Sequence, residues 1–167
     1  MSCLGVLFSL EEKEVNKLKS FKSDDDRLDY LQQEIEAIYF EDFPERVAEL
    51  DKSWDAIHRS LTDGKLGYTN GSFPLNHVIL GGEIIYFSDD YIMTIKTPEQ
   101  VRQIAIAIDK VDNESLRTAY YKIDENDYGF PLSKDDFEYT RDWFDGSKEF
   151  WKLAATEKRF VLFTADQ

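Results

Sequence analysis

The sequence is poor in cysteine and in long apolar runs, and each shortage excludes a class of protein. Cys3 is the single cysteine among 167 residues, so an internal disulfide cannot form and an oxidising compartment is not indicated. The apolar start of the chain, residues 3–8, lacks a basic flank and is far too short to cross a bilayer. We therefore expect a cytoplasmic protein that does not insert into a membrane.

Basic residues are scarce as well. Lys and Arg number 20 against 34 Asp and Glu, which gives a formal net charge of -14. A surface of this sign repels nucleic-acid phosphates, and no basic patch with interleaved aromatic residues offsets it, so nucleic acid is not an expected partner. The charge has two interpretations: it provides solubility alone, or it attracts a basic protein surface.

Motifs for metals, cofactors and common catalytic sites are missing too. Cys3, His58 and His77 are the only cysteine and histidine residues, and their spacing does not match a zinc site. The glycines follow neither the Rossmann nor the P-loop spacing, and the Gly-x-Ser-x-Gly motif of serine hydrolases is absent. Residues 124–135 match a calcium loop only in part, and a loop between helices explains them better. We expect no cofactor and no metal.

The sequence does contain enough apolar material for one domain. Hydrophobic residues make up 42% of the chain and include 12 Phe, 9 Tyr and 3 Trp, which can supply a sizeable core. No internal repeat occurs at the periods of solenoid proteins. The sequence therefore predicts a single compact domain over residues 1–167.

Apolar spacing and capping residues predict an α+β fold, with a small mixed or antiparallel sheet packed against about six helices. Strands are predicted at residues 3–8, 78–80, 84–87, 91–95 and 159–164, with a hairpin among the middle three. Helices are predicted at residues 10–20, 23–38, 50–64, 97–108, 113–120 and 133–155. Predicted helix caps are Ser9 with Glu12, Ser23, Thr97 with Gln100, Asn113, and Ser133.

The predicted helix at residues 50–64 is the most site-like segment. Its apolar stripe consists of Leu50, Trp54, Ile57 and Leu61. A second stripe, about 90° round the helix, consists of Asp51, Asp55, His58 and Thr62. The first stripe predicts that Trp54 packs in the core. The second predicts that His58 is at least partly accessible and is hydrogen-bonded to Asp55, Asp51 or the loop beyond Gly64.

A histidine beside carboxylates can act as an acid or base, because a carboxylate fixes the tautomer and raises the pKa of the imidazole. The alternative is a surface or helix-packing histidine. A nucleophile is not visible nearby in the sequence, and a pair with Cys3 would require the fold to bring a strand against this helix.

Three segments together resemble the YfbM-like family, a bacterial family of unknown function: residues 50–64, 74–82 and 97–101. The resemblance extends over nearly the whole chain, because the apolar start with Gly5 and the segment at 150–155 also match the ends of the family. It implies a single α+β domain. It implies no reaction, so no catalytic residue is transferred to this chain.

Two functions follow as hypotheses. In the first, the protein is a non-enzymatic interaction module whose acidic surface binds a basic protein, as an inhibitor or immunity-type partner does. In the second, a cleft binds or hydrolyses a small polar ligand; it lies between the stripe at Asp51, Asp55 and His58 and the loop at residues 67–77. In the second hypothesis Trp54 is a wall of the cleft. The residues of this candidate cleft are Asp51, Trp54, Asp55, His58, Thr62 and His77.

Overall fold

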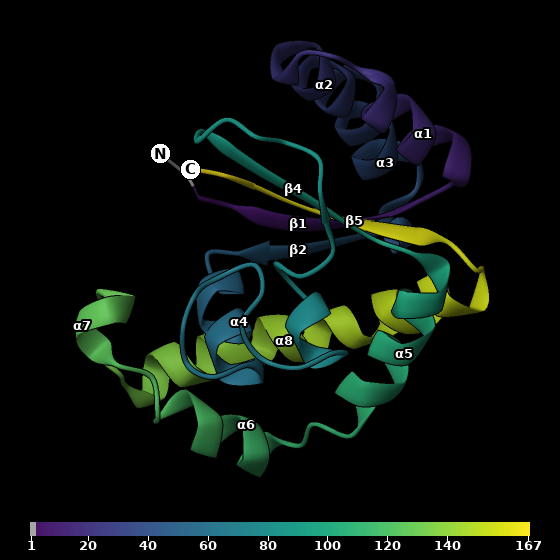
Figure 1. Ribbon diagram of the computed structural model, residues 1–167. Coiled ribbons are helices and arrows are strands. Elements are labelled where there is room, and N and C mark those ends of the chain that lie inside the picture. The colour runs from purple at the N-terminus through teal and green to yellow at the C-terminus, as the bar shows by residue number, and fades with distance from the viewer. Residues whose placement is uncertain (1–2) are drawn as a thin grey trace.

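The computed structural model in Figure 1 describes residues 3–167 and contains one antiparallel sheet. The strand order is β2-β1-β5-β4-β3. The strands are β1 (Gly5–Leu10), β2 (Val47–Asp51), β3 (Glu83–Ile84), β4 (Tyr91–Lys96) and β5 (Phe160–Asp166). Strands β1 and β5 pair along their length, from Gly5 opposite Ala165 to Leu10 opposite Phe160. The first and last strands of the chain therefore form the middle of the sheet.

Helices cover both faces of the sheet (Figure 1). One face carries α1 (Glu12–Ser20), α2 (Asp24–Tyr30) and α3 (Ala37–Asp42), with a π-helical turn at Leu31–Glu36 between the last two. The other face carries α4 (Trp54–Leu61), α5 (Pro98–Asp109), α6 (Asn113–Tyr120) and α8 (Lys134–Thr156). The short α7 (Glu125–Tyr128) lies beside the start of α8, and short 3-10 turns occupy Pro44–Arg46 and Leu75–His77.

Alternation along the strands divides the apolar residues between two cores. In β5, Val161 and Phe163 belong to the larger core, under α4, α5, α6 and α8, whereas Leu162 belongs to the smaller core, under α1 and the helical run that follows it. This is the period-two pattern of a sheet that is buried on both faces. Strand β4 places two polar side chains, Thr94 and Lys96, in the interior with no exposed surface.

The predicted α+β class and single domain are confirmed. Strands at 91–95 and 159–164 and the helices at 97–108 and 113–120 correspond to β4, β5, α5 and α6. Thr97 and Gln100 form the predicted capping box, and the hydroxyls of Ser23 and Ser133 accept the amide hydrogens of Asp26 and Asp136. Helix α8 passes through Gly146 without interruption, as its apolar phase predicts.

Several local predictions were wrong. Residues 78–80 form a buried turn rather than a strand, and of the strand predicted at 84–87 only Ile84 lies in β3, which pairs with β4. The predicted cap at Ser9 lies inside β1, and Glu11 caps α1 together with Glu14. Asp112, rather than Asn113, caps α6. At Ser9 the pairing of β1, and at Asn113 the neighbouring Asp112, provide backbone hydrogen bonds that the local pattern did not reveal.

The predicted helix at 50–64 begins only at Trp54, because the residues before it form β2. Leu50 and Asp51 belong to this strand, which pairs with β1 and was not predicted. Asp51 has a φ of 51°, and the amide of Ser53 donates to the carbonyl of Leu50 at 3.0 Å. This tight turn separates Asp51 from the helix, so the predicted second stripe is interrupted at its first residue.

Candidate functional site

Four strand ends meet at one end of the sheet and are surrounded by hollows in the surface. The pairings of Gly5 with Asp51 and of Tyr91 with Asp166 place the start of β1, the end of β2, the start of β4 and the end of β5 side by side. One of these hollows is lined mainly by carboxylates, and another is lined mainly by aromatic rings. We call them the acidic groove and the aromatic cleft.

The acidic groove has a volume of about 420 Å³. Its carboxylates are Glu36, Glu49, Asp51 and Asp166, and its aromatic residues are Phe40, Tyr91 and Trp143. No lysine, arginine or histidine is among the residues that line it. The groove therefore gathers negative charge from three separate parts of the chain without a basic residue in its walls.

The electrostatics of the groove reflect this crowding. Burial raises the pKa of Glu36, and the negative charge of Asp166 raises it further, although a hydrogen bond from Tyr91 at 3.3 Å opposes both effects. Burial and the charge of Glu36 likewise raise the pKa of Tyr91. Asp166 accepts the backbone amide hydrogen of Leu4 at 2.7 Å. A cation bound in the groove would relieve the repulsion between Glu36 and Asp166.

The aromatic cleft is lined by residues of α4, α7 and the start of α8 and has a volume of about 490 Å³. Its aromatic residues are Trp54, Tyr128, Phe130 and Tyr139, and its carboxylates are Asp55 and Asp136. The indole nitrogen of Trp54 donates to the carbonyl of Cys3 at 2.9 Å, and the amide of Lys52 donates to the hydroxyl of Tyr139 at 3.0 Å. These bonds fix two of the walls.

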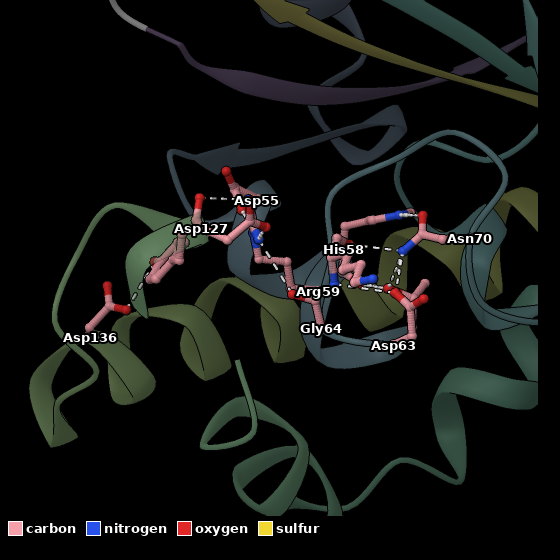
Figure 2. A network of polar contacts seen from close by, with 11 residues as sticks. Asp55, His58, Arg59, Asp63, Gly64, Asn70, Asp127 and Asp136 are labelled. Carbon is pink, nitrogen blue, oxygen red and sulfur yellow. Dashed lines mark hydrogen bonds and ion pairs between the residues drawn. The ribbon is translucent and has the colours of Figure 1, made fainter. Parts of the chain in front are cut away.

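Arg59 stabilises the region beside the cleft (Figure 2). Its side chain is 5% exposed; Nε donates to Asp55 at 2.6 Å, and one terminal nitrogen donates to Asp127 at 2.5 Å. The guanidinium also lies 5.6 Å from the centre of the Tyr128 ring. Burial raises the pKa of Asp55, and the hydrogen bond from Arg59 partly reverses this effect. Arg59 thus joins α4 to α7.

The structure does not place the six predicted site residues in one cleft. Trp54 and Asp55 line the aromatic cleft, whereas Asp51 lines the acidic groove. Thr62 lines a third hollow, beside α6, and donates to the carbonyl of His58 at 2.7 Å. His77 packs edge-on against Phe73, with ring centres 4.9 Å apart, and lies next to Asn76. Asp51 is separated from the others because it belongs to β2, and Thr62 and His77 are separated from the cleft because they follow the end of α4.

The expectation that His58 is accessible was wrong, because the loop after α4 covers it. His58 is 1% exposed, and Nε2 lies 3.1 Å from the amide oxygen of Asn70 (Figure 2). The expected bond to the loop beyond Gly64 is thereby confirmed. Asn70 is held in turn by Thr62 and Asp63. Burial lowers the pKa of His58, while the Asn70 oxygen and the Gly67 carbonyl partly oppose this. The geometry is that of a packing histidine.

We expect replacement of His58 by alanine to lower the free energy of unfolding by about 2 kcal/mol, since it leaves a cavity and removes a buried hydrogen bond. A lowered pKa means that the unfolded chain binds more protons just below pH 6.5, so this residue makes stability rise with pH up to about that value. The difference in the free energy of unfolding between pH 5 and pH 7, measured by urea denaturation, should be smaller in the variant than in the original protein. An unchanged free energy of unfolding at pH 7 would contradict the packing role.

Sequence reasoning missed the residues that complete the two hollows. Tyr128 and Phe130 were assigned to a loop, and Tyr139 and Trp143 to a helix without a function. The available signal was the high density of aromatic residues and acids between positions 124 and 143. It exceeds what the apolar stripe of α8 needs for packing against the core. Phe130 is 64% exposed and lines the aromatic cleft together with Tyr128 and Tyr139.

Within residues 3–167, the side chains of histidine, cysteine, aspartate and glutamate do not form a group of three that could hold a metal ion. In the same part of the chain, no helix is both long and apolar enough to cross a membrane.

The fold is that of a single-domain α+β protein with two hollows at one end of the sheet. The chain belongs to the family described as a domain of unknown function, DUF1877, whose model matches residues 1–164.

A solved structure described as a protein of unknown function, YfbM from Escherichia coli, has a similar fold. It is 17% identical in sequence, with a TM-score of 0.64, and the match covers 97% of this chain and 99% of that one. No curated protein matches the chain. The predicted resemblance to the YfbM-like family is therefore confirmed, and the comparison supports the fold without assigning a reaction.

Proposed function

We propose that this protein is an interaction module that binds a basic protein partner, with the acidic groove receiving an arginine or lysine side chain of that partner. The observation that supports this proposal is the composition of the groove. Four carboxylates line it, and none of its lining residues is basic. The net charge of -14 would guide a basic partner towards the protein over a longer range.

The aromatic residues of the groove fit the same ligand. Phe40 is 42% exposed, and Trp143 is half-buried, so both offer apolar surface to the stem of a long basic side chain. A cation close to an aromatic ring is attracted by the ring electrons. The salt bridges of the protein involve other acids, so Glu36, Glu49 and Asp51 do not form an ion pair within residues 3–167.

The test uses two tripeptides of nearly the same shape, acetyl-Gly-Arg-Gly-amide and its citrulline analogue, which is uncharged. Binding is followed by tryptophan fluorescence and by calorimetry. We expect the arginine peptide to bind at least about tenfold more tightly. Its affinity should fall as salt shortens the screening length from about 10 Å at 0.1 M to about 3 Å at 1 M. Equal affinities for the two peptides would contradict the proposal.

Two variants that remove the same number of charges separate the contribution of the groove to binding from the contribution of the net charge. The triple variant Glu36→Gln, Glu49→Gln and Asp51→Asn should abolish the preference for arginine. The control triple variant Glu12→Gln, Asp29→Asn and Glu114→Gln removes the same charge at exposed positions outside the groove. It should retain most of the affinity. An equal loss in both variants would show that net charge alone attracts the peptide.

The rival hypothesis is a small-molecule cleft around Trp54, Asp55 and His58, and two of these three residues do line a cleft. Trp54 and Asp55 line a cleft of suitable size, but His58 is not among its lining residues. Cys3 lines the cleft, but His58 is buried outside it, so the two side chains do not face each other across the cleft. The geometry therefore favours binding over hydrolysis at this place.

A further inference from the structure

The aromatic cleft differs from the acidic groove in composition and in size. Its volume of about 490 Å³ falls within the range of small-molecule sites, which is about 300 to 1,000 Å³. Rings of Trp54, Tyr128, Phe130 and Tyr139 line it. Trp54 is almost fully buried, whereas Phe130 is largely exposed at the rim. Such walls can hold an apolar body of about the size of one or two rings.

Two carboxylates give the cleft a polar part. Oδ1 of Asp55 accepts from Nε of Arg59 at 2.6 Å. Oδ2 of Asp136 accepts from the hydroxyls of Tyr120 and Tyr128, at 2.6 and 2.9 Å. Within residues 3–167, the remaining oxygens, Oδ2 of Asp55 and Oδ1 of Asp136, do not accept a hydrogen bond. A carboxylate oxygen with unused lone pairs is a good acceptor for an ammonium group.

Both carboxylates are linked to Tyr128. Asp136 accepts a hydrogen bond from the Tyr128 hydroxyl, and Asp55 accepts one from Arg59, whose guanidinium lies over the Tyr128 ring. Burial raises the pKa of Tyr128, and the negative charges of both carboxylates raise it further. Each carboxylate offers an oxygen without a hydrogen bond to a cationic group in the cleft.

The basic residues near the cleft do not occupy the free carboxylate oxygens that a cationic ligand would need. Arg59 is buried and committed to Asp55 and Asp127. Lys52 is the single basic residue among those that line the cleft, and it is exposed without an ion pair in the described part of the chain. A cationic ligand would therefore meet the carboxylates inside and one lysine at the rim.

We propose that the aromatic cleft binds a small organic amine with an apolar body. The ammonium group binds the unused carboxylate oxygen of Asp55 or of Asp136, and the apolar body packs against the aromatic walls, where the ring electrons also attract the cation. This site is separate from the acidic groove and does not depend on the proposed protein partner.

The test titrates the full chain with 2-phenylethylamine and with 2-phenylethanol, which has a similar shape but no charge. Tryptophan fluorescence and calorimetry measure binding. We expect saturable binding of the amine and an affinity at least about tenfold above that of the alcohol. Equal affinities, or no saturable binding of the amine at concentrations up to about 10 mM, would overturn the proposal.

Three variants locate the ligand. Phe130→Ala should weaken amine binding at least about fivefold, whereas Phe87→Ala, which truncates another exposed phenylalanine that does not line the cleft, should not change it. Lys52→Gln should strengthen binding of the amine about twofold at low salt and leave the alcohol unchanged, because it removes a like charge at the rim. No response to Phe130→Ala or to Lys52→Gln would overturn the assignment to the cleft.

The triple variant of the acidic groove separates this proposal from the proposed function. It should abolish the arginine preference and leave amine binding intact. If the amine were lost in that variant and retained in Phe130→Ala, the amine would occupy the groove and the assignment to the aromatic cleft would be wrong. If the arginine peptide failed to bind while the amine bound as expected, only the proposed function would be contradicted.

Discussion

Replacing Trp54 by alanine should lower the free energy of unfolding by about 3 to 5 kcal/mol, the usual cost of removing a large buried aromatic side chain. Trp54 is 5% exposed, and its ring centre lies 5.6 Å from that of Phe163 in the middle of the sheet. Gly5 makes this contact possible, because a Cβ atom at that position would lie 2.6 Å from Cδ1 of the indole. The indole therefore closes the core at the start of β1.

Urea denaturation measures this effect, and Trp143→Ala is the matched control. Trp143 is only half-buried, so its truncation should cost clearly less. The hydrogen bond from the Trp54 indole to the Cys3 carbonyl adds to the loss, since the carbonyl then depends on water. A cost below about 1 kcal/mol for Trp54→Ala would mean that the cavity collapses or that the indole contributes little to the core.

The fold was largely predictable because most elements carry their own local signals. Thr97, Pro98 and Gln100 begin α5 through backbone capping that needs no tertiary contact. The apolar period of α8 persists through Gly146, where a side chain would meet open space, so the glycine has only an intrinsic cost. Strand β2 lacked such a signal. Its assignment depends on pairing with β1, which lies about 40 residues earlier in the sequence.

The candidate site was less predictable, since it depends on distant segments. Helical periodicity correctly indicated a buried Trp54, but it could not show that residues 62–72 fold over His58. In the groove, the register of the sheet brings Asp51 close to Asp166, and Glu36 joins them from the π-helical turn. The cleft similarly combines α4 with α7 and α8 through Arg59. Contacts between segments that are far apart in the sequence cannot be predicted from residue spacing.

Lys96 is the other residue from which we expect a large effect, because its amine is buried without a carboxylate partner in residues 3–167. It has no exposed surface, and Nζ donates to the carbonyl of Ile79 and to the hydroxyl of Thr94. The amine also lies 5.5 Å from the centre of the Phe163 ring. Burial lowers the pKa of Lys96 well below its usual range. His58 and His77 lie close enough for its charge to lower their pKa values.

Replacing Lys96 by methionine, which has a similar length and no charge, should therefore raise the free energy of unfolding at pH 7 by about 1 to 4 kcal/mol, as when other buried ionic groups are replaced by apolar ones. Between the lowered pKa of the folded state and the ordinary value near 10.4, the unfolded chain binds one more proton than the folded protein, so stability rises with pH. The methionine variant should lose this slope, and the two proteins should approach one another in stability above about pH 10. Urea unfolding from pH 6 to pH 10.5 measures both effects, with Lys22→Met, at an exposed lysine, as the control. A slope that persists unchanged in Lys96→Met would show that other groups cause it and that the amine is solvated more effectively than its burial indicates.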